Sequence, residues 1–151
     1  MDASHPRPRR ALRVEAATLE GEIERRVRER SPQLLAQRGV GPISAACILS
    51  SWSHRGGLRS EAAFARLAGA APIPASSGNT VRHRLDRGGD RRLNRAPHTI
   101  LLTRRRLDAG TQTYIARRLS EGKSERGAVR CLKRYLARSL FRMLEAMPTA
   151  A

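Results

Sequence analysis

The chain has 151 residues and carries 30 lysines and arginines against 13 aspartates and glutamates, giving a formal net charge of +17. This length accommodates one ordinary domain with an appended segment and excludes a second full domain. So basic a chain repels itself unless a polyanion neutralises it, and nucleic acid offers a dense row of phosphates. GC-rich coding raises the arginine content and so contributes to this charge, since only two residues of the chain are lysine. It does not explain the shortage of acidic residues after residue 80. Nucleic acid is therefore the expected partner.

The two cysteines, Cys47 and Cys131, are far apart and have no CxxC spacing or histidine partner. This predicts reduced thiols in a cytosolic protein and no zinc site. No stretch approaches the ~20 apolar residues that span a bilayer, and no export signal is recognisable. We therefore expect a cytoplasmic protein without a membrane partner.

The N-terminal part is predicted to be a disordered basic tail over residues 1–11, followed by one amphipathic helix over 12–31. Its apolar residues recur at steps of four and three, at Leu12, Ala16, Leu19 and Ile23. About two heptads are too short for a stable coiled coil. The helix therefore either packs on the domain behind it or forms the end of a longer coiled coil.

Residues 33–50 have the pattern of a helix-hairpin-helix, in which Gly39, Val40 and Gly41 join two apolar segments. The glycines allow a tight turn and close approach to a phosphate. Pro42 fits the first position of the second helix, whose exposed N–H groups favour an anion. A purely structural helical hairpin would have the same pattern, so contact with a DNA backbone is a hypothesis.

In the middle of the chain, Ser60 predicts the N-cap of a short helix that runs through Leu67 and ends at Gly69. The loop at 70–80 cannot be regular helix, because it contains two prolines and a Ser-Ser-Gly-Asn run. Residues 81–92 carry five arginines and a histidine around a Gly-Gly turn. We expect a minor β-hairpin near residues 80–85.

Three further helices are expected in the C-terminal half. Asp90 caps the first of them, and this helix is kinked near Pro97. The second helix starts at Thr111 or Thr113, and the third starts at Ser124. The first has apolar positions at Leu93, Ala96, Ile100, Leu101 and Leu107. The third has an apolar stripe at Val129, Leu132, Leu136, Leu140, Met143 and Met147, with Arg130, Lys133, Arg134, Arg138 and Arg142 off it. The predicted fold is mainly α, one compact helical domain over 32–147.

Phosphodiester chemistry needs metal-holding carboxylates or a nucleophile beside charge-neutralising groups. The acids form no cluster on a predicted face, which argues against a two-metal nuclease. Ser76 and Ser77 precede a flexible glycine, and arginines that can hold a phosphate follow within a few residues. The alternative is a polar turn near a bound phosphate. His83 is open to three roles: general base, phosphate ligand or turn cap.

The chain resembles the insertion-sequence transposases of family one-ten, whose members include bridge-RNA-guided recombinases. The resemblance covers about residues 12–145 in several separated segments. The matching segments are 35–49 with Gly39-Val40-Gly41-Pro42, 58–65, 72–78 with Pro72-Ile73-Pro74-Ala75-Ser76-Ser77-Gly78, 82–91, 121–124 and 130–135.

The resemblance implies an N-terminal RuvC-like domain with a DEDD acidic set, a coiled-coil connector and a C-terminal transposase domain with a catalytic serine. This chain resembles the end of the connector and that C-terminal domain. The family serine precedes a glycine, which implies that Ser77 is the position that attacks DNA and forms a phosphoserine link. The resemblance further implies DNA as partner, a guide RNA, a homo-oligomer, a location at the bacterial nucleoid, and Mg²⁺ only in the RuvC-like domain, with no cofactor in this chain.

The residues expected to bind nucleic acid are Gly39, Val40, Gly41, Arg82, His83, Arg84, Arg87, Arg91, Lys123, Lys133 and Arg134. The sequence lacks the acidic domain, and residues 51–57 replace a Gly-Asp-Asn-like loop, so we expect a truncated element that is inactive alone. The alternatives are a non-catalytic helix-hairpin-helix module and a basic RNA-binding protein. The five aromatic residues suggest no platform for base stacking.

Overall fold

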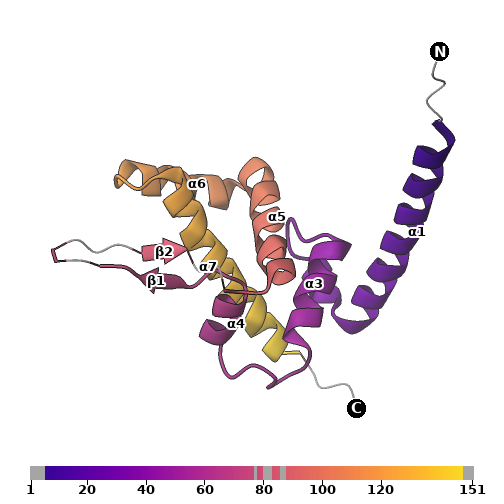
Figure 1. The fold of residues 1–151 in the computed structure, drawn as a ribbon, viewed down its shortest axis with the longest axis horizontal. Helices are drawn as coiled ribbons and strands as arrows, with labels where there is room; N and C mark the ends of the chain where they lie inside the picture. Colours follow the sequence, from indigo (N-terminus) through magenta and orange to yellow (C-terminus); the bar gives the residue numbers. More distant parts are fainter. Residues whose placement is uncertain (1–5, 77, 80–82, 86–87, 148–151) are drawn as a thin grey trace.

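The computed structural model describes residues 6–76, 78–79, 83–85 and 88–147. Within this part the fold is mainly α with one two-stranded antiparallel sheet, which confirms the predicted class (Figure 1). The elements are α1 (Pro6–Arg30), α2 (Pro32–Leu35), α3 (Pro42–Trp52), α4 (Glu61–Leu67), β1 (Pro72–Pro74), β2 (His83–Leu85), α5 (Arg91–Leu107), α6 (Ala109–Ser120) and α7 (Glu125–Glu145). None of the described helices is long and apolar enough to cross a membrane.

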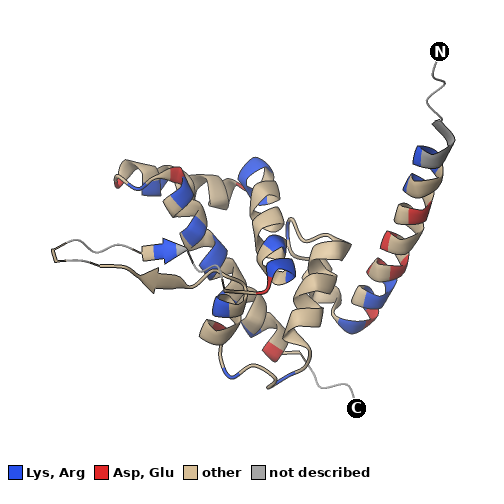
Figure 2. Cartoon of the chain, in the orientation of Figure 1, with Lys and Arg blue, Asp and Glu red and all other residues tan. Residues whose placement is uncertain are grey.

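Helix α1 projects away from the other helices, and the β-hairpin projects on the opposite side (Figure 1). Helix α1 begins at Pro6, before the predicted start at residue 12, because a proline is well tolerated in a first helical turn that needs no N–H donor. Only its C-terminal end packs on the domain, where Val27 is buried, while Leu12 and Leu19 stay exposed. Acidic and basic residues alternate along it (Figure 2).

The core lies where α3 packs on α5 and α4 packs on α7. Its largest fully buried side chains include Phe64, Ile48 and Ile100, and the ring centroids of Phe64 and Phe141 are 5.7 Å apart. The predicted apolar stripe of the last helix is confirmed, since all its members are buried or partly buried. Leu107 departs from the prediction, because it ends α5 at the turn into α6 and is 67% exposed.

Three of the predicted helix caps are confirmed. Ser60 Oγ accepts from the Ala63 N–H, and Ser124 Oγ accepts from the Gly127 N–H, both at 3.1 Å. Asp90 Oδ1 accepts from the N–H of Arg92 at 2.7 Å. Each cap satisfies N–H groups that have no partner inside the helix.

The predicted start of the short helix at Thr111 or Thr113 is wrong. Helix α6 begins at Ala109 and is capped by Asp108, whose Oδ2 accepts from both the N–H and the hydroxyl of Thr111 at 2.8 Å. Asp108 serves the end of α5 and the start of α6 at once, because the two helices meet at this single residue. These hydrogen bonds hold the pKa of Asp108 below its ordinary value.

Two arginines that lie off the apolar stripe of α7 pair with Glu61 on α4, although the Arg142 side chain stays 66% exposed. Arg138 Nε donates to Glu61 Oε1 at 2.7 Å, and Arg142 Nη1 lies 3.5 Å from Glu61 Oε2. The hydrogen bond from Arg138 lowers the pKa of Glu61. These two charges join helices of the core, so they contribute less to the basic surface than their sequence positions suggest.

Candidate nucleic-acid interface

A cavity of about 500 Å³ lies between the base of the β-hairpin and the N-terminal half of α7. Three segments that are remote in sequence form its wall: the chain that follows α4, strand β2, and the turn into α7 with its first three turns. The lining residues are Gly69, Ala70, Ala71, Pro72, His83, Arg84, Lys123, Ser124, Gly127, Arg130, Cys131, Lys133 and Arg134.

The backbone brings the hairpin to this position by a close contact between its two ends. The strands pair antiparallel with Ile73 opposite Arg84 and Pro74 opposite His83. Beyond the hairpin, the N–H of Asp90 donates to the carbonyl of Leu67 at 2.8 Å. A Cβ on Gly89 would collide with that carbonyl and would lie 2.7 Å from the Gly69 nitrogen. Only glycine therefore fits where the chain leaves the hairpin.

The lining of the cavity is basic. It contains His83, Arg84, Lys123, Arg130, Lys133 and Arg134, and no carboxylate is among the lining residues that the structure describes. The N-terminus of the 21-residue helix α7, where the helix dipole places partial positive charge, opens on the same cavity. Arginines and lysines also follow one another along α7 (Figure 2). The arrangement suits an anion with several negative oxygens, such as a phosphate of a nucleic-acid backbone.

Lys133 is the half-buried cation of this lining. Its Nζ donates to Asn94 Oδ1 on α5 at 2.6 Å, which fixes the ammonium group at the inner wall. Burial lowers the pKa of Lys133, because the charged form loses hydration. Nζ has three N–H groups and Asn94 takes one, so donors remain for an anion in the cavity.

The lowered pKa of Lys133 predicts how stability depends on pH. The folded state releases this proton at lower pH than the unfolded state, so unfolding binds a proton between the lowered pKa and the ordinary lysine value. In that window we expect the free energy of unfolding of the wild type, minus that of Lys133→Met, to rise with pH. Urea unfolding at several alkaline pH values measures this difference, and a difference that does not change with pH would contradict the assignment. Lys123→Met controls for the loss of one positive charge.

The structure brings five of the predicted nucleic-acid-binding residues into one cavity: His83, Arg84, Lys123, Lys133 and Arg134. Ser77, Arg82 and Arg87 lie outside the described residues. Arg91 is exposed in the first turn of α5 and is not part of the lining. Sequence reasoning missed Arg130 as a site residue, although its spacing of three and four residues from Lys133 and Arg134 places all three on one helix face.

The Gly39-Val40-Gly41 turn lies elsewhere and packs against α5. Gly39 has φ +79°, and a Cβ there would lie 3.0 Å from the carbonyl oxygen of Ile100. Val40 is buried, whereas Gly41 is exposed at the N-terminus of α3. The helix before the turn, α2, has only four residues. Packing against α5 thus accounts for the first glycine, and only Gly41 is exposed to a partner.

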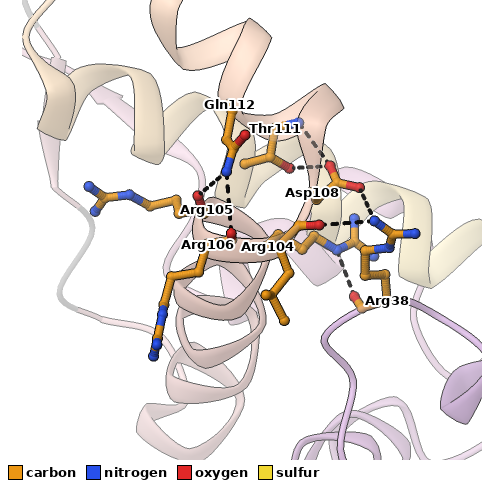
Figure 3. A network of polar contacts seen from close by, with 8 residues as sticks. Arg38, Arg104, Arg105, Arg106, Asp108, Thr111 and Gln112 are labelled. Atoms are coloured by element: carbon orange, nitrogen blue, oxygen red, sulfur yellow. Dashed lines mark hydrogen bonds and ion pairs between the residues drawn. The ribbon is translucent and has the colours of Figure 1, made fainter.

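Hydrogen bonds and an ion pair hold this turn to the α5–α6 junction (Figure 3). Arg104 Nε donates to the carbonyl of Arg38 at 2.8 Å, and Arg38 Nη1 lies 3.7 Å from Asp108 Oδ1. Gln112 Nε2 donates to the carbonyls of Arg105 and Arg106 at 3.0 and 3.3 Å. These contacts give the arginines around the turn a structural role.

Comparison with known proteins identifies one family. The model described as "Transposase IS116/IS110/IS902 family" matches residues 31–116, which is more than half of the chain. The match includes α2 to α5, the hairpin and most of α6, and it ends before α7. A search of curated proteins finds no significant match.

Proposed function

Because the chain belongs to the IS116/IS110/IS902 transposase family, we propose that it is the DNA-binding C-terminal part of an insertion-sequence transposase and that the basic cavity holds the DNA backbone. The single observation that carries this proposal is the convergence of basic side chains from β2, the α6–α7 turn and α7 on one cavity whose described lining contains no carboxylate. A duplex carries one phosphate charge per ~1.7 Å of axis, so several lining cations can be neutralised together.

We further propose Ser77 as the nucleophile, on the strength of its resemblance to the family serine. The loop that carries Ser77 joins β1 to β2, and β2 supplies His83 and Arg84 to the cavity wall. In the proposed step, Ser77 Oγ forms a bond to phosphorus while one P–O bond of the backbone breaks. The Oγ proton is lost and the departing oxygen takes up a proton, so the transesterification needs no oxidant or reductant. Cations around the phosphate stabilise the charge that develops on its oxygens.

Among the residues that the structure describes, no three His, Cys, Asp or Glu side chains lie close enough to hold a metal ion by themselves. No step of the serine attack proposed for this chain is therefore routed through a metal. The resemblance implies Mg²⁺ in a separate RuvC-like domain. We propose that the chain binds DNA alone and attacks it only when that domain is supplied, and that a guide RNA and further copies of the chain join the complex.

Alanine at Ser77 tests the nucleophile. With a RuvC-like domain of an active family member added, we expect the wild type to form a protein–DNA adduct that survives denaturation, and Ser77→Ala to form none because the attacking oxygen is gone. Gel electrophoresis of labelled DNA measures the adduct. Ser76→Ala is the matched control and should retain it.

DNA affinity, measured by fluorescence anisotropy, should be the same in wild type and Ser77→Ala, because cations and not the serine provide the binding. An adduct that persists in Ser77→Ala would rule out this residue as nucleophile. Binding without any adduct, in wild type and variant alike, would instead favour a non-catalytic DNA-binding module.

A further inference from the structure

We propose that the two tyrosines of the chain, Tyr114 and Tyr135, form a stacking site for an unpaired base of the nucleic acid whose backbone enters the neighbouring basic cavity. The inference rests on the proposed DNA-binding function and adds the kind of nucleic-acid element that is bound. An unpaired base offers two flat faces, and aromatic side chains bind such faces without regard to sequence.

The fold brings the two tyrosines together from different helices. Tyr114 lies on α6 and Tyr135 on α7, with ring centroids 6.3 Å apart and ring planes at 82°. Tyr114 is half-buried, whereas Tyr135 is 58% exposed. An edge-to-face contact with Tyr114 thus braces Tyr135 and leaves more than half of it open to a ligand.

Two arginines lie beside the Tyr114 ring. The guanidinium carbons of Arg117 and Arg118 lie 5.4 and 5.9 Å from the Tyr114 ring centroid. Both arginines also contact Glu121, so their side chains are held in place next to the ring. Glu121 offsets one of the two positive charges, so a net positive charge remains beside the ring. A partner that is both flat and negatively charged, as a nucleotide is, suits this surface.

The tyrosine pair adjoins the basic cavity along α7. Cys131 lines the cavity one helical turn before Tyr135, and Arg134 lines it directly before Tyr135. Four residues of helix rise by about 6 Å, so the exposed ring lies one turn from the cavity wall. A strand whose phosphate lies in the cavity can therefore place its adjacent base on Tyr135 if that base is unpaired. A base within an intact duplex is stacked on its neighbours and offers no free face.

Binding of a short single-stranded oligonucleotide and of the matched blunt duplex tests the proposal by fluorescence anisotropy at ~0.1 M salt. Tyr135→Ala should weaken single-strand binding about 10-fold, because one base loses its stacking partner. Duplex binding should be unchanged. Tyr135→Phe, which keeps the ring, should bind the single strand like the wild type. Leu102→Ala, which removes another exposed apolar side chain on α5, should change neither affinity.

An equal loss for single strand and duplex, or no loss for either, would overturn the proposal. We expect Tyr135→Ala to unfold at the same temperature as the wild type, because the ring is more than half exposed. A folded Tyr135→Ala protein whose single-strand binding is unchanged would also contradict the proposal. Repeating the titration with DNA and RNA strands of the same sequence identifies which nucleic acid supplies the base. A loss of single-strand affinity in Tyr135→Ala, without a loss of duplex affinity, supports the stacking site with either strand. If the wild type does not bind the duplex at all, the proposed DNA-backbone function fails independently of this result.

Discussion

Replacing Lys123, Arg130 and Arg134 together with glutamine is expected to lower the affinity for a DNA duplex about 100-fold at ~0.1 M salt. All three side chains line the basic cavity, and none of them forms an ion pair with a carboxylate in the part of the chain that the structure describes. Each phosphate contact releases condensed counterions, so losing three contacts should also reduce the slope of log affinity against log salt by roughly 2.7. Anisotropy titrations at several salt concentrations measure both quantities.

The matched control removes the same charge from α1. Arg25, Arg26 and Arg28 each pair with a glutamate four residues away, so their charges are locally neutralised. They lie on α1, which projects from the domain on the side opposite the β-hairpin (Figure 1). Replacing these three with glutamine gives the same net charge as the cavity variant. We expect at most a twofold change in affinity, on the order of the small long-range term that remains after salt screening. Equal losses in the two triple variants would mean that affinity follows net charge and that the cavity is not the binding site.

Alanine at Gly89 destabilises the protein by about 3 kcal/mol. Its Cβ would overlap the carbonyl of Leu67 and crowd the nitrogen of Gly69, and both are backbone atoms that cannot rotate away. The same carbonyl accepts the hydrogen bond from Asp90, so the shift would disturb the junction of α4, the hairpin and α5. Chemical unfolding should show the loss directly, and the midpoint of thermal unfolding should fall by about 6–12 °C.

Gly21→Ala is the control for a glycine substitution. Gly21 lies in the exposed part of α1, and a Cβ there meets no atom within 4 Å. Alanine loses less backbone entropy in a helix, so this variant should be more stable by about 0.5–1 kcal/mol, or unchanged if α1 unfolds separately. A Gly89→Ala protein as stable as the wild type would show that the close approach at the hairpin does not exist in solution.

Features that depend on neighbours in sequence could be predicted from the sequence. Ser60, Asp90 and Ser124 cap helices as expected, because a cap needs only a side-chain oxygen and the next few N–H groups. The apolar stripe of the last helix follows from helical periodicity. The proline and glycine pattern similarly indicated the hairpin, although its first strand lies at Pro72–Pro74, outside the predicted range.

Features that join distant segments could be predicted only in part. The sequence predicts basic residues at His83 and Lys133, but nothing in it indicates that they line the same cavity, because that depends on how α7 packs beside the hairpin. Gly39 was interpreted as a phosphate contact, whereas its close neighbour is the backbone of α5. Packing against a remote helix leaves the same glycine pattern in the sequence as an anion-binding turn does.

The sequence by itself determined the basic character of the chain, its helical class and the N-caps of three helices, since these follow from composition and from interactions over a few residues. Only the tertiary structure decided which charges are available. It pairs Arg138 with Glu61 inside the fold, while it leaves Arg130 at the cavity. It also brings Tyr114 against Tyr135, although the aromatic content alone suggested no stacking platform. The physical reason is that contacts between helices depend on their packing, which periodicity within each helix does not specify.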